Sequence, residues 1–346
     1  MFFASDNAGP AHPRVMEALA AANEGYAMPY GKDPIMARVT ERVRAFFEAP
    51  EAAVYLVGTG TACNALLLAA MTKPWETIFC SDVAHIYEDE CGAPEFFTGG
   101  ARLTLVDAPH GLMTPEGLER AVSGIEPGDV QSVQRGPLSL TSVSERGTVY
   151  DLAHLRGLCD IAGAAGLSVH LDGARLCNAL VSLDCTPAEL TWKSGVDTVS
   201  FGGTKNGLLG VEAAVIFDPE IAWEFELRRK RAGHLFSKHR YLSAQMDAYL
   251  EGDLWREMAG RANAAAERLA RGLEESRHGR LLHPRMANVV YCEMPAERHE
   301  RLRAEGARFY SLGPSSTGDG WHQARLVCDW SATPEGTDRF LSVLNA

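Results

Sequence analysis

Short apolar runs alternate with helical segments between residues 34 and 218, and this alternation limits the folds open to the chain. The runs that read as buried strands are residues 53–57, 77–81, 101–108, 138–143, 167–172, 196–201 and 212–218. The helical segments among them are residues 34–48, 58–71, 115–124 and 152–166. Strands interleaved with helices are typical of a mostly parallel sheet covered on both faces. The sequence therefore predicts a large α/β domain.

The C-terminal part of the chain has a different pattern. Residues 219–278 are strongly helical, and further apolar runs that read as strands lie at 288–294, 307–312 and 324–330. Helical segments follow at 295–306 and 333–345. This arrangement predicts a smaller α+β domain. We expect the large domain to span residues 1–250 and the small domain residues 251–346.

The charge balance argues against a nucleic-acid partner. The 346 residues carry a formal net charge of -12, and the pI is about 5.4. Proteins that bind a phosphate backbone usually carry a basic face or stripe. The one basic cluster here, Arg228 to Arg231, lies on a predicted helix and is interpreted as a solvated face.

Cysteine spacing and hydropathy indicate the cellular compartment in which the protein is expected. The eight cysteines occur singly, with no C-x-x-C pair and no Cys/His cluster at zinc spacing, so we expect reduced thiols and no metal site. The N-terminus lacks a basic segment followed by a long apolar one, and no stretch approaches the roughly 20 apolar residues of a membrane helix. These features predict a cytoplasmic protein with no membrane partner.

Polar residues that follow apolar strands are the first candidates for a site, because open parallel sheets bind ligands beyond the carboxyl ends of their strands. Gly58, Thr59 and Gly60 form a turn between a strand and a helix, and a helix N-terminus there could hold a phosphate. This turn is a weak signal alone, since it lacks the lysine of a P-loop and the full dinucleotide fingerprint.

Two further strand ends carry charged side chains. Asp172 ends the strand at 167–172 with Arg175 shortly after it, and Lys205 follows the strand at 196–201 among glycines. A lysine desolvated in a cleft can attack a carbonyl as a neutral amine. A reactive lysine, a carboxylate for a pyridinium nitrogen and a helix N-terminus for a phosphate are what pyridoxal phosphate requires. The combination predicts a site for that cofactor.

These residues belong to longer segments through which the chain resembles the low-specificity L-threonine aldolases, and especially their phenylserine aldolase branch. The resemblance extends over essentially the whole length of the chain. The matching segments are SDNAGP (5–10), YGKDP (30–34), GTGTACNAL (58–66), AHIYEDECGAPEFF (84–97), HLDGARLCNALVSL (170–183), FGGTKNG (201–207), RRKRAGHLFSKHRYLSAQ (228–245) and ARLVCDW (324–330). The resemblance implies a fold-type I pyridoxal phosphate enzyme. It also implies retro-aldol cleavage of L-β-hydroxy-α-amino acids, such as threonine, allo-threonine and phenylserine, to glycine and an aldehyde.

The resemblance also implies roles for the cofactor residues. Lys205 matches the lysine that links covalently to the cofactor, and Asp172 matches the carboxylate that keeps the pyridine nitrogen protonated. His85 matches the histidine that lies over the cofactor ring, where it could stack or move a proton directly or through water. Glu88 and Asp89 follow closely and are candidates to orient His85.

Substrate binding is expected from a second group of residues. Arg325 matches the family's carboxylate clamp, since a guanidinium can hold a carboxylate bidentately. Ser5 matches a serine that assists it, and Arg175 matches an arginine that reaches cofactor or carboxylate. Tyr30 matches a segment at the subunit interface near the active site. The resemblance further implies a homodimer or homotetramer with shared active sites.

This sequence departs from the family pattern in two places. The stretch GHLFSKHR replaces a glycine-rich segment whose arginine approaches the phosphate, and Lys238 or Arg240 could substitute for that arginine. The stretch SLTSVSERG lacks a histidine that many relatives carry as a candidate base. Ser144 or Glu145 occupies that region, so the base is expected to be His85 or water.

Other functions use the same residues. A β-eliminating lyase or an aminotransferase would need the same lysine, aspartate and phosphate turn, and the fold does not separate these reactions. A non-catalytic binding protein with this fold, and a nucleotide-binding transferase built on the Thr59 turn, are weaker alternatives. The retained Lys205, Asp172, His85 and Arg325 count against the first, and the missing phosphate lysine counts against the second.

Overall fold

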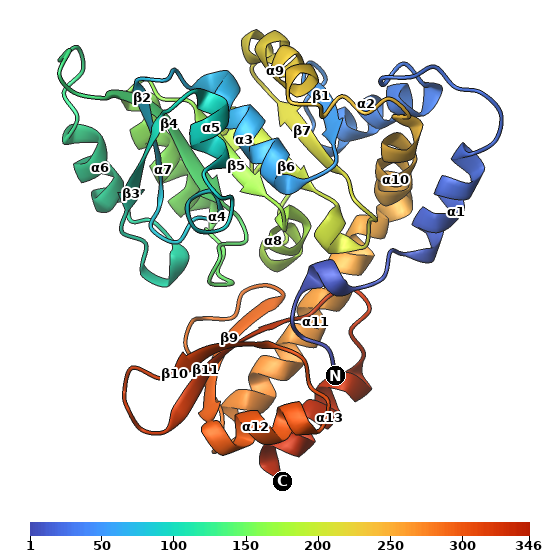
Figure 1. The fold of residues 1–346 in the computed structure, drawn as a ribbon, viewed down its shortest axis with the longest axis vertical. Coiled ribbons are helices and arrows are strands. Elements are labelled where there is room, and N and C mark those ends of the chain that lie inside the picture. The colour runs from blue at the N-terminus through green and yellow to red at the C-terminus, as the bar shows by residue number, and fades with distance from the viewer.

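The computed structural model describes all residues, 1–346, and contains two β-sheets (Figure 1). The large sheet has seven strands in the order β1-β7-β6-β5-β4-β2-β3. Its strands are β1 Ala53–Val57, β2 Glu76–Ser81, β3 Arg102–Val106, β4 Gln134–Thr141, β5 Val169–Gly173, β6 Thr198–Gly202 and β7 Glu212–Ile216. Only β7 runs antiparallel to its neighbours. The mostly parallel sheet predicted from the apolar runs is confirmed.

Helices cover both faces of the large sheet. They are α1 Pro13–Ala22, α2 Pro34–Phe46, α3 Gly60–Met71, α4 His85–Glu88, α5 Ala93–Thr98, α6 Pro115–Ser123, α7 Leu152–Ala164, α8 Leu176–Leu183, α9 Pro219–Arg231 and α10 Arg240–Leu250. Alternate residues of β7 belong to different apolar clusters, because successive side chains point to opposite faces of a strand. Ala213 and Val215 join the main core, whereas Ala214 and Ile216 pack with residues of α3 and α9.

The small sheet is antiparallel, with the order β10-β11-β9-β8. Its strands are β8 Arg280–Leu281, β9 Val289–Pro295, β10 Tyr310–Pro314 and β11 Trp321–Val327, accompanied by α12 Ala296–Ala304 and α13 Pro334–Asn345. The predicted strand at 324–330 therefore begins earlier, at Trp321, and Arg325 lies inside β11 instead of at its start.

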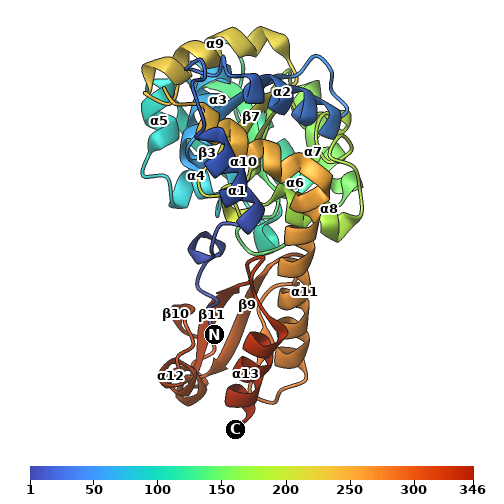
Figure 2. The same cartoon turned by 90° about the vertical axis from the view of Figure 1, so that its right-hand side faces the viewer.

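Two segments connect the halves of the molecule, as Figure 2 shows. Helix α11 (Leu254–Glu274) has its first turns in the main core, through Ala259, and its later turns in the small-domain core from Ala265 onward. The N-terminal segment lies against the small domain, since Phe3 donates its N–H to Arg308 O (2.7 Å) and is buried in that core. The division at residue 250 stays a prediction.

Local signals explain where α2 begins. Asp33 caps the helix by accepting the Met36 N–H at 2.9 Å, and Pro34 occupies the first helical position, where its missing N–H costs nothing. Met36, Val39 and Val43 then form the buried stripe predicted by their helical spacing. This stripe packs α2 onto the main core.

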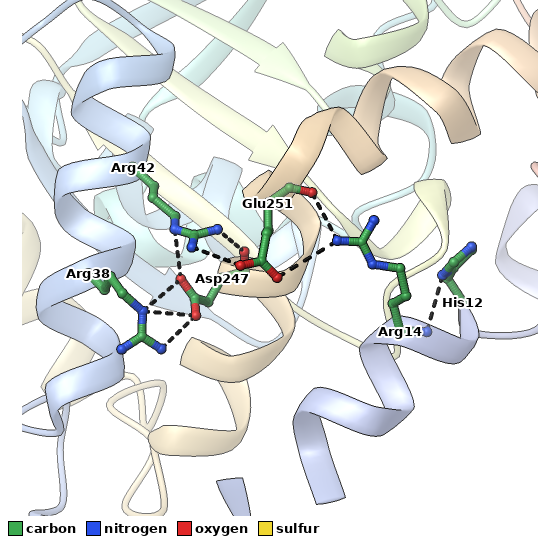
Figure 3. Close-up of polar contacts among 6 residues, drawn as sticks. All are labelled: His12, Arg14, Arg38, Arg42, Asp247 and Glu251. Carbon is green, nitrogen blue, oxygen red and sulfur yellow. Dashed lines mark hydrogen bonds and ion pairs between the residues drawn. The ribbon is translucent and has the colours of Figure 1, made fainter. Parts of the chain in front are cut away.

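An ionic network joins α1 and α2 to α10 (Figure 3). Asp247 accepts hydrogen bonds from Arg38 (Nη2–Oδ2 2.7 Å) and pairs with Arg42 (Nε–Oδ1 3.1 Å). Glu251 pairs with Arg42 at 3.2 Å and with Arg14 at 3.7 Å. The Arg14 backbone N–H donates to His12 Nδ1, which caps α1. Asp247 and Glu251 each pair with two arginines, and Asp247 is the more buried of the two, with 16% of its side chain exposed against 59% for Glu251.

Several other sequence predictions have an outcome in the fold. All eight cysteines are free thiols, and six of them are buried: Cys63, Cys80, Cys159, Cys177, Cys292 and Cys328. None of the helices is both long and apolar enough to cross a membrane.

The interpretation of Arg228 to Arg231 as a solvated face is wrong for Arg229, which is 4% exposed. Its guanidinium lies 4.9 Å from the Tyr55 ring and donates to Leu56 O.

We predict that Asp247→Asn lowers the free energy of unfolding by about 1 kcal/mol, because the partly buried carboxylate loses its charge beside two arginines. Urea denaturation measures this. The control is Asp184→Asn, which removes a single pair with Arg256 at a side chain that is 85% exposed and should change nothing measurable. Equal effects of the two substitutions would contradict a special role for the network.

Candidate functional site

A cavity of about 490 Å³ lies between the carboxyl ends of the large-sheet strands and the small sheet. Thr141 and Asp172 reach it from β4 and β5, while Tyr291, Tyr310 and Arg325 reach it from the small sheet. Among the residues predicted from the sequence, the cavity wall brings together Ser5, His85, Asp172, Arg175, Lys205 and Arg325. Residues that are far apart in the chain therefore converge here.

Lys205 is presented by a tight turn directly after β6. Glycine is required in this stretch, because a Cβ at Gly202 would overlap the backbone of Ala174. Two hydrogen bonds fix the turn. Glu212 accepts the Gly203 N–H at 2.8 Å, and Asn206, within the turn, donates to Tyr249 Oη at 2.7 Å. Burial raises the pKa of Glu212 to about 7.

The Lys205 amine makes no hydrogen bond or ion pair with any residue of the chain. Burial lowers its pKa, and the nearby Arg175 charge lowers it further. Burial disfavours the ammonium form, so the neutral amine is more accessible here than for a surface lysine. A neutral amine facing a cavity can attack a carbonyl carbon.

Asp172 is held in the ionised state. Burial alone would raise its pKa, but the charges of His85 and Lys205 outweigh burial and lower it. Its Oδ1 accepts the Ala174 N–H and its Oδ2 accepts Asn64 Nδ2, both at 2.9 Å. A buried carboxylate with fixed donors on both oxygens can stabilise a cation or a protonated nitrogen in the cavity.

Asn64 in α3 connects Asp172 to the rest of the site. Its Nδ2 also donates to Glu90 Oε1 at 2.9 Å, and its Oδ1 accepts from Ser200 Oγ at 2.7 Å and lies 3.1 Å from His170 Nε2. These contacts fix which end of the amide is the donor. The amide therefore joins two buried carboxylates that would otherwise repel each other.

His85 is oriented by Glu90, with Nδ1 2.8 Å from Oε1. With Glu90 ionised, Oε1 can only accept, so the imidazole Nδ1 is the donor. The hydrogen bond that His85 donates to Glu90 raises the pKa of His85 in spite of burial. The suggestion that Glu88 or Asp89 orients His85 is wrong. Both are exposed, since α4 ends at Glu88 and the chain turns inward only at Glu90.

The two arginines of the cavity differ in their partners. Arg175 makes a bidentate pair with Asp6, at 2.6 Å from Nε and 3.0 Å from Nη2, and Asn288 also donates to Asp6. The Arg325 guanidinium has no hydrogen-bond or ion-pair partner, and burial together with the Arg175 charge lowers its pKa. Arg325 is therefore the cation that is free to bind an anion.

These residues fit pyridoxal phosphate. An unpaired amine, an ionised carboxylate and an imidazole line one cavity, and the chemistry of this donor set matches what the cofactor needs. Helix α3 begins at Gly60, where neither Gly58 nor Gly60 has a neighbouring atom within 4 Å of an added Cβ. Thr59 Oγ1 caps α3 by accepting the Ala62 N–H at 3.2 Å, which leaves the O–H as a donor.

The structure does not bring every predicted site residue into the cavity wall. Gly58, Thr59 and Gly60 lie at the start of α3 outside that wall, and phosphate binding there stays a prediction. Tyr30 also lies outside, where its N–H donates to Ser237 O at 3.1 Å and Lys230 Nζ lies 5.0 Å from its ring centroid. Its role in substrate binding stays a prediction.

Lys238 and Arg240 share that neighbourhood and are also outside the cavity. Both line a separate hollow of about 300 Å³ formed with residues 25–29. Arg240 donates to Gly25 O at 3.0 Å, and Lys238 is exposed. Neither reaches the cavity of its own chain.

Three comparisons with known proteins bear on this site. A family model described as beta-eliminating lyase matches residues 3–295. A low specificity L-threonine aldolase of Pseudomonas aeruginosa is 38% identical over 96% of this chain and 94% of its own length. A protein of the same name from another Pseudomonas strain is 37% identical over 95% of this chain and 92% of its own.

Comparison with solved structures supports the fold described above. A threonine aldolase of Leishmania major matches with a TM-score of 0.93 and 26% identity, over 99% of this chain and 98% of that one. A serine palmitoyltransferase containing pyridoxal phosphate matches with a TM-score of 0.71 over 100% of this chain and 86% of that one. Its identity is 16%, so it speaks for the fold alone.

We predict that Asp6→Asn releases the N-terminal segment from the cavity. A buried pair that loses one charge leaves the other uncompensated, which costs about 3 kcal/mol. Hydrogen exchange of residues 1–9 should therefore become faster. The control is Asp338→Asn, which breaks the bidentate but exposed pair with Arg268. Unchanged exchange in Asp6→Asn would contradict the pair's anchoring role.

The same pair should show a pH dependence. Burial alone would raise the pKa of Asp6, but its interactions with Arg175 outweigh burial and lower it. The contribution of the pair is therefore complete above the ordinary carboxyl pKa of about 4 and is lost as the pH falls through the lower folded value.

Proposed function

This chain belongs to the beta-eliminating lyase family and, within it, to the low-specificity threonine aldolases, and on that premise we propose that it cleaves L-β-hydroxy-α-amino acids to glycine and an aldehyde with pyridoxal phosphate. Threonine, allo-threonine and phenylserine are the proposed substrates. The observation that carries the proposal is the unpaired, largely desolvated Lys205 amine in one cavity with the ionised Asp172.

The roles of the cofactor residues follow from their surroundings. When bound, pyridoxal phosphate supplies an electron sink for the reaction at the amino acid's Cα. Lys205 would hold the cofactor covalently, because its pKa is lowered and nothing in the chain occupies its nitrogen. Asp172 would keep a proton on the pyridine nitrogen, since its two oxygens are fixed and its charge is retained.

Arg325 is the residue best placed to bind the substrate carboxylate. Its guanidinium faces the cavity without a partner, and a planar carboxylate matches its two parallel donors. Arg175 gives two of its five N–H groups to Asp6, so it fixes the cavity wall and adds positive charge, and its contact with cofactor or carboxylate stays a prediction. Ser5, on the same wall, would assist Arg325 through its hydroxyl.

Apolar side chains line the part of the cavity that faces the small sheet. Val143 belongs to the large domain, while Tyr291, Tyr310 and Leu312 come from the small one. Tyr310 and Leu312 are 54% and 47% exposed, so apolar surface is open to a ligand there. This surface supports acceptance of an aryl group at Cβ, as in phenylserine, in addition to the methyl group of threonine.

A second copy of the chain is proposed to complete the enzyme. Tyr26, Met28, Tyr30 and Phe236 are exposed by 106%, 62%, 45% and 50% respectively, which is unusual for large apolar side chains in one neighbourhood. Covering them in a homodimer or homotetramer would remove this surface from water. A cytoplasmic location is proposed as well, supported by the eight unpaired cysteines.

Product analysis tests the proposed function. The purified protein, supplied with pyridoxal phosphate, should release equal amounts of glycine and aldehyde from L-threonine and from L-phenylserine. Lys205→Ala should release neither, whereas Lys73→Ala, at a side chain that is 67% exposed, should match the native protein.

Other products would point to other reactions. Ammonia with a keto acid would indicate β-elimination, which the family's name also covers, and a keto acid alone with transfer of the amino group would indicate an aminotransferase. Either result would contradict aldol cleavage.

A further inference from the structure

Glu145 is a partly buried acid on the cavity wall that the roles above leave unused. It lies just after β4 in a turn closed by the Gly147 N–H to Ser144 O bond at 2.9 Å. Ser144 Oγ and Thr148 Oγ1, 2.6 Å apart, brace the same turn. The carboxyl group is therefore held on a rigid support at the edge of the cavity.

The two oxygens of Glu145 have different surroundings. Oε1 accepts the backbone N–H of His85 at 2.9 Å. Oε2 is buried from solvent and has no donor within the chain. Buried acceptors are nearly always hydrogen-bonded, so an unpaired one on a cavity wall calls for a donor supplied by a ligand. The expectation that His85 or water serves as the base leaves this oxygen unexplained.

We propose that Glu145 Oε2 accepts a hydrogen bond from the β-hydroxyl of the bound amino acid and takes its proton as the Cα–Cβ bond breaks. The proposal rests on the proposed aldol cleavage and assigns its proton acceptor. A hydroxyl is the donor that distinguishes β-hydroxy-α-amino acids from other amino acids. The carboxylate would thus contribute to substrate recognition and to the reaction.

The step balances without another reactant. The O–H bond of the substrate breaks and a new O–H bond forms on Glu145. The oxygen forms a C=O bond to Cβ, the Cα–Cβ bond breaks, and its electron pair stays with the glycine fragment. Cα then takes up one proton, which equals the one given to Glu145. Threonine therefore yields acetaldehyde and glycine only.

His85 is less suited to accept this proton. Its Nδ1 donates to Glu90, and that hydrogen bond raises its pKa, which favours the charged imidazole, and a charged imidazole has no nitrogen free to accept a proton. Burial, together with the Asp172 charge, raises the pKa of Glu145 to about 7. A carboxylate with a pKa near neutrality is a stronger base than an ordinary carboxylate. At neutral pH a substantial fraction of such groups is still ionised and able to accept a proton.

The charged and titratable groups that face Glu145 come from several elements. They are His85 at the start of α4, Cys80 of β2, Asp172 of β5, Arg175 before α8 and Tyr150 before α7. Since Glu145 must be ionised to accept a proton, the cleavage rate should rise with pH through about 7 and then level off.

The test compares two reactions in the enzyme loaded with pyridoxal phosphate. One is cleavage of L-threonine as a function of pH. The other is exchange of the α-protons of glycine with deuterated water, followed by NMR, which involves no β-hydroxyl. Glu145→Gln keeps an acceptor for the His85 N–H but loses the base. It should slow cleavage by about 100-fold or more, lose the rise near pH 7, and retain glycine exchange and glycine affinity.

Two further variants sharpen the test. Glu119→Gln, at an exposed acid on α6 that lies outside the cavity wall and makes no side-chain hydrogen bond or ion pair, should behave as the native protein. Glu145→Ala leaves space where the carboxylate was, so added formate should restore part of the cleavage rate without changing glycine exchange. Rescue of cleavage alone identifies a missing base, which a merely structural role would not produce.

The opposing results are distinct. Cleavage and a pH profile unchanged in Glu145→Gln would overturn the proposal while leaving the aldolase function intact. Equal losses of cleavage and glycine exchange, with no rescue by formate, would also overturn it, because they would show a structural role. A native protein that exchanges glycine but cleaves no threonine would overturn the proposed function, and this proposal with it.

Discussion

The ion pair between Asp6 and Arg175 fixes the relation between the two halves of the molecule at the cavity. The N-terminal segment is bound to the small domain, since the Val327 N–H donates to Phe3 O at 2.8 Å. Three residues later, Asp6 is bound to the large domain through two hydrogen bonds to Arg175. Because this segment crosses the junction, the pair and helix α11 together hold the two halves in the arrangement that forms the cavity.

The cavity concentrates cations, and their balance determines its chemistry. Arg175 lies close enough to Lys205 and to Arg325 to lower the pKa of each, and Asp6 and Asp172 are the nearby ionised acids. In a region of low dielectric constant, each unpaired charge favours a ligand of the opposite sign. The free Arg325 guanidinium and the lowered pKa of Lys205 are thus two consequences of the same arrangement. A ligand with a carboxylate and a phosphate complements the positive charge of these cavity residues.

The sequence alone was sufficient for those features that depend on local pattern. The strand at 53–57 was predicted with the bounds of β1, and Asp172 and Lys205 were found because each follows a buried strand of one parallel sheet. Asn64 and Asp6 were missed, because their partners lie 108 and 169 residues away and only the fold brings them together. Glu90 was missed in favour of its neighbours because the sequence does not show where α4 ends.

The central claim is that Lys205 holds the cofactor. It is tested most directly by reducing the pyridoxal phosphate-loaded protein with sodium borohydride, which makes the link to a lysine permanent, and then locating the label by peptide mass spectrometry. The account predicts a single pyridoxyl group on Lys205, in the peptide that contains FGGTKNG. A label on a different lysine, or no label on a protein that has bound the cofactor, would contradict it.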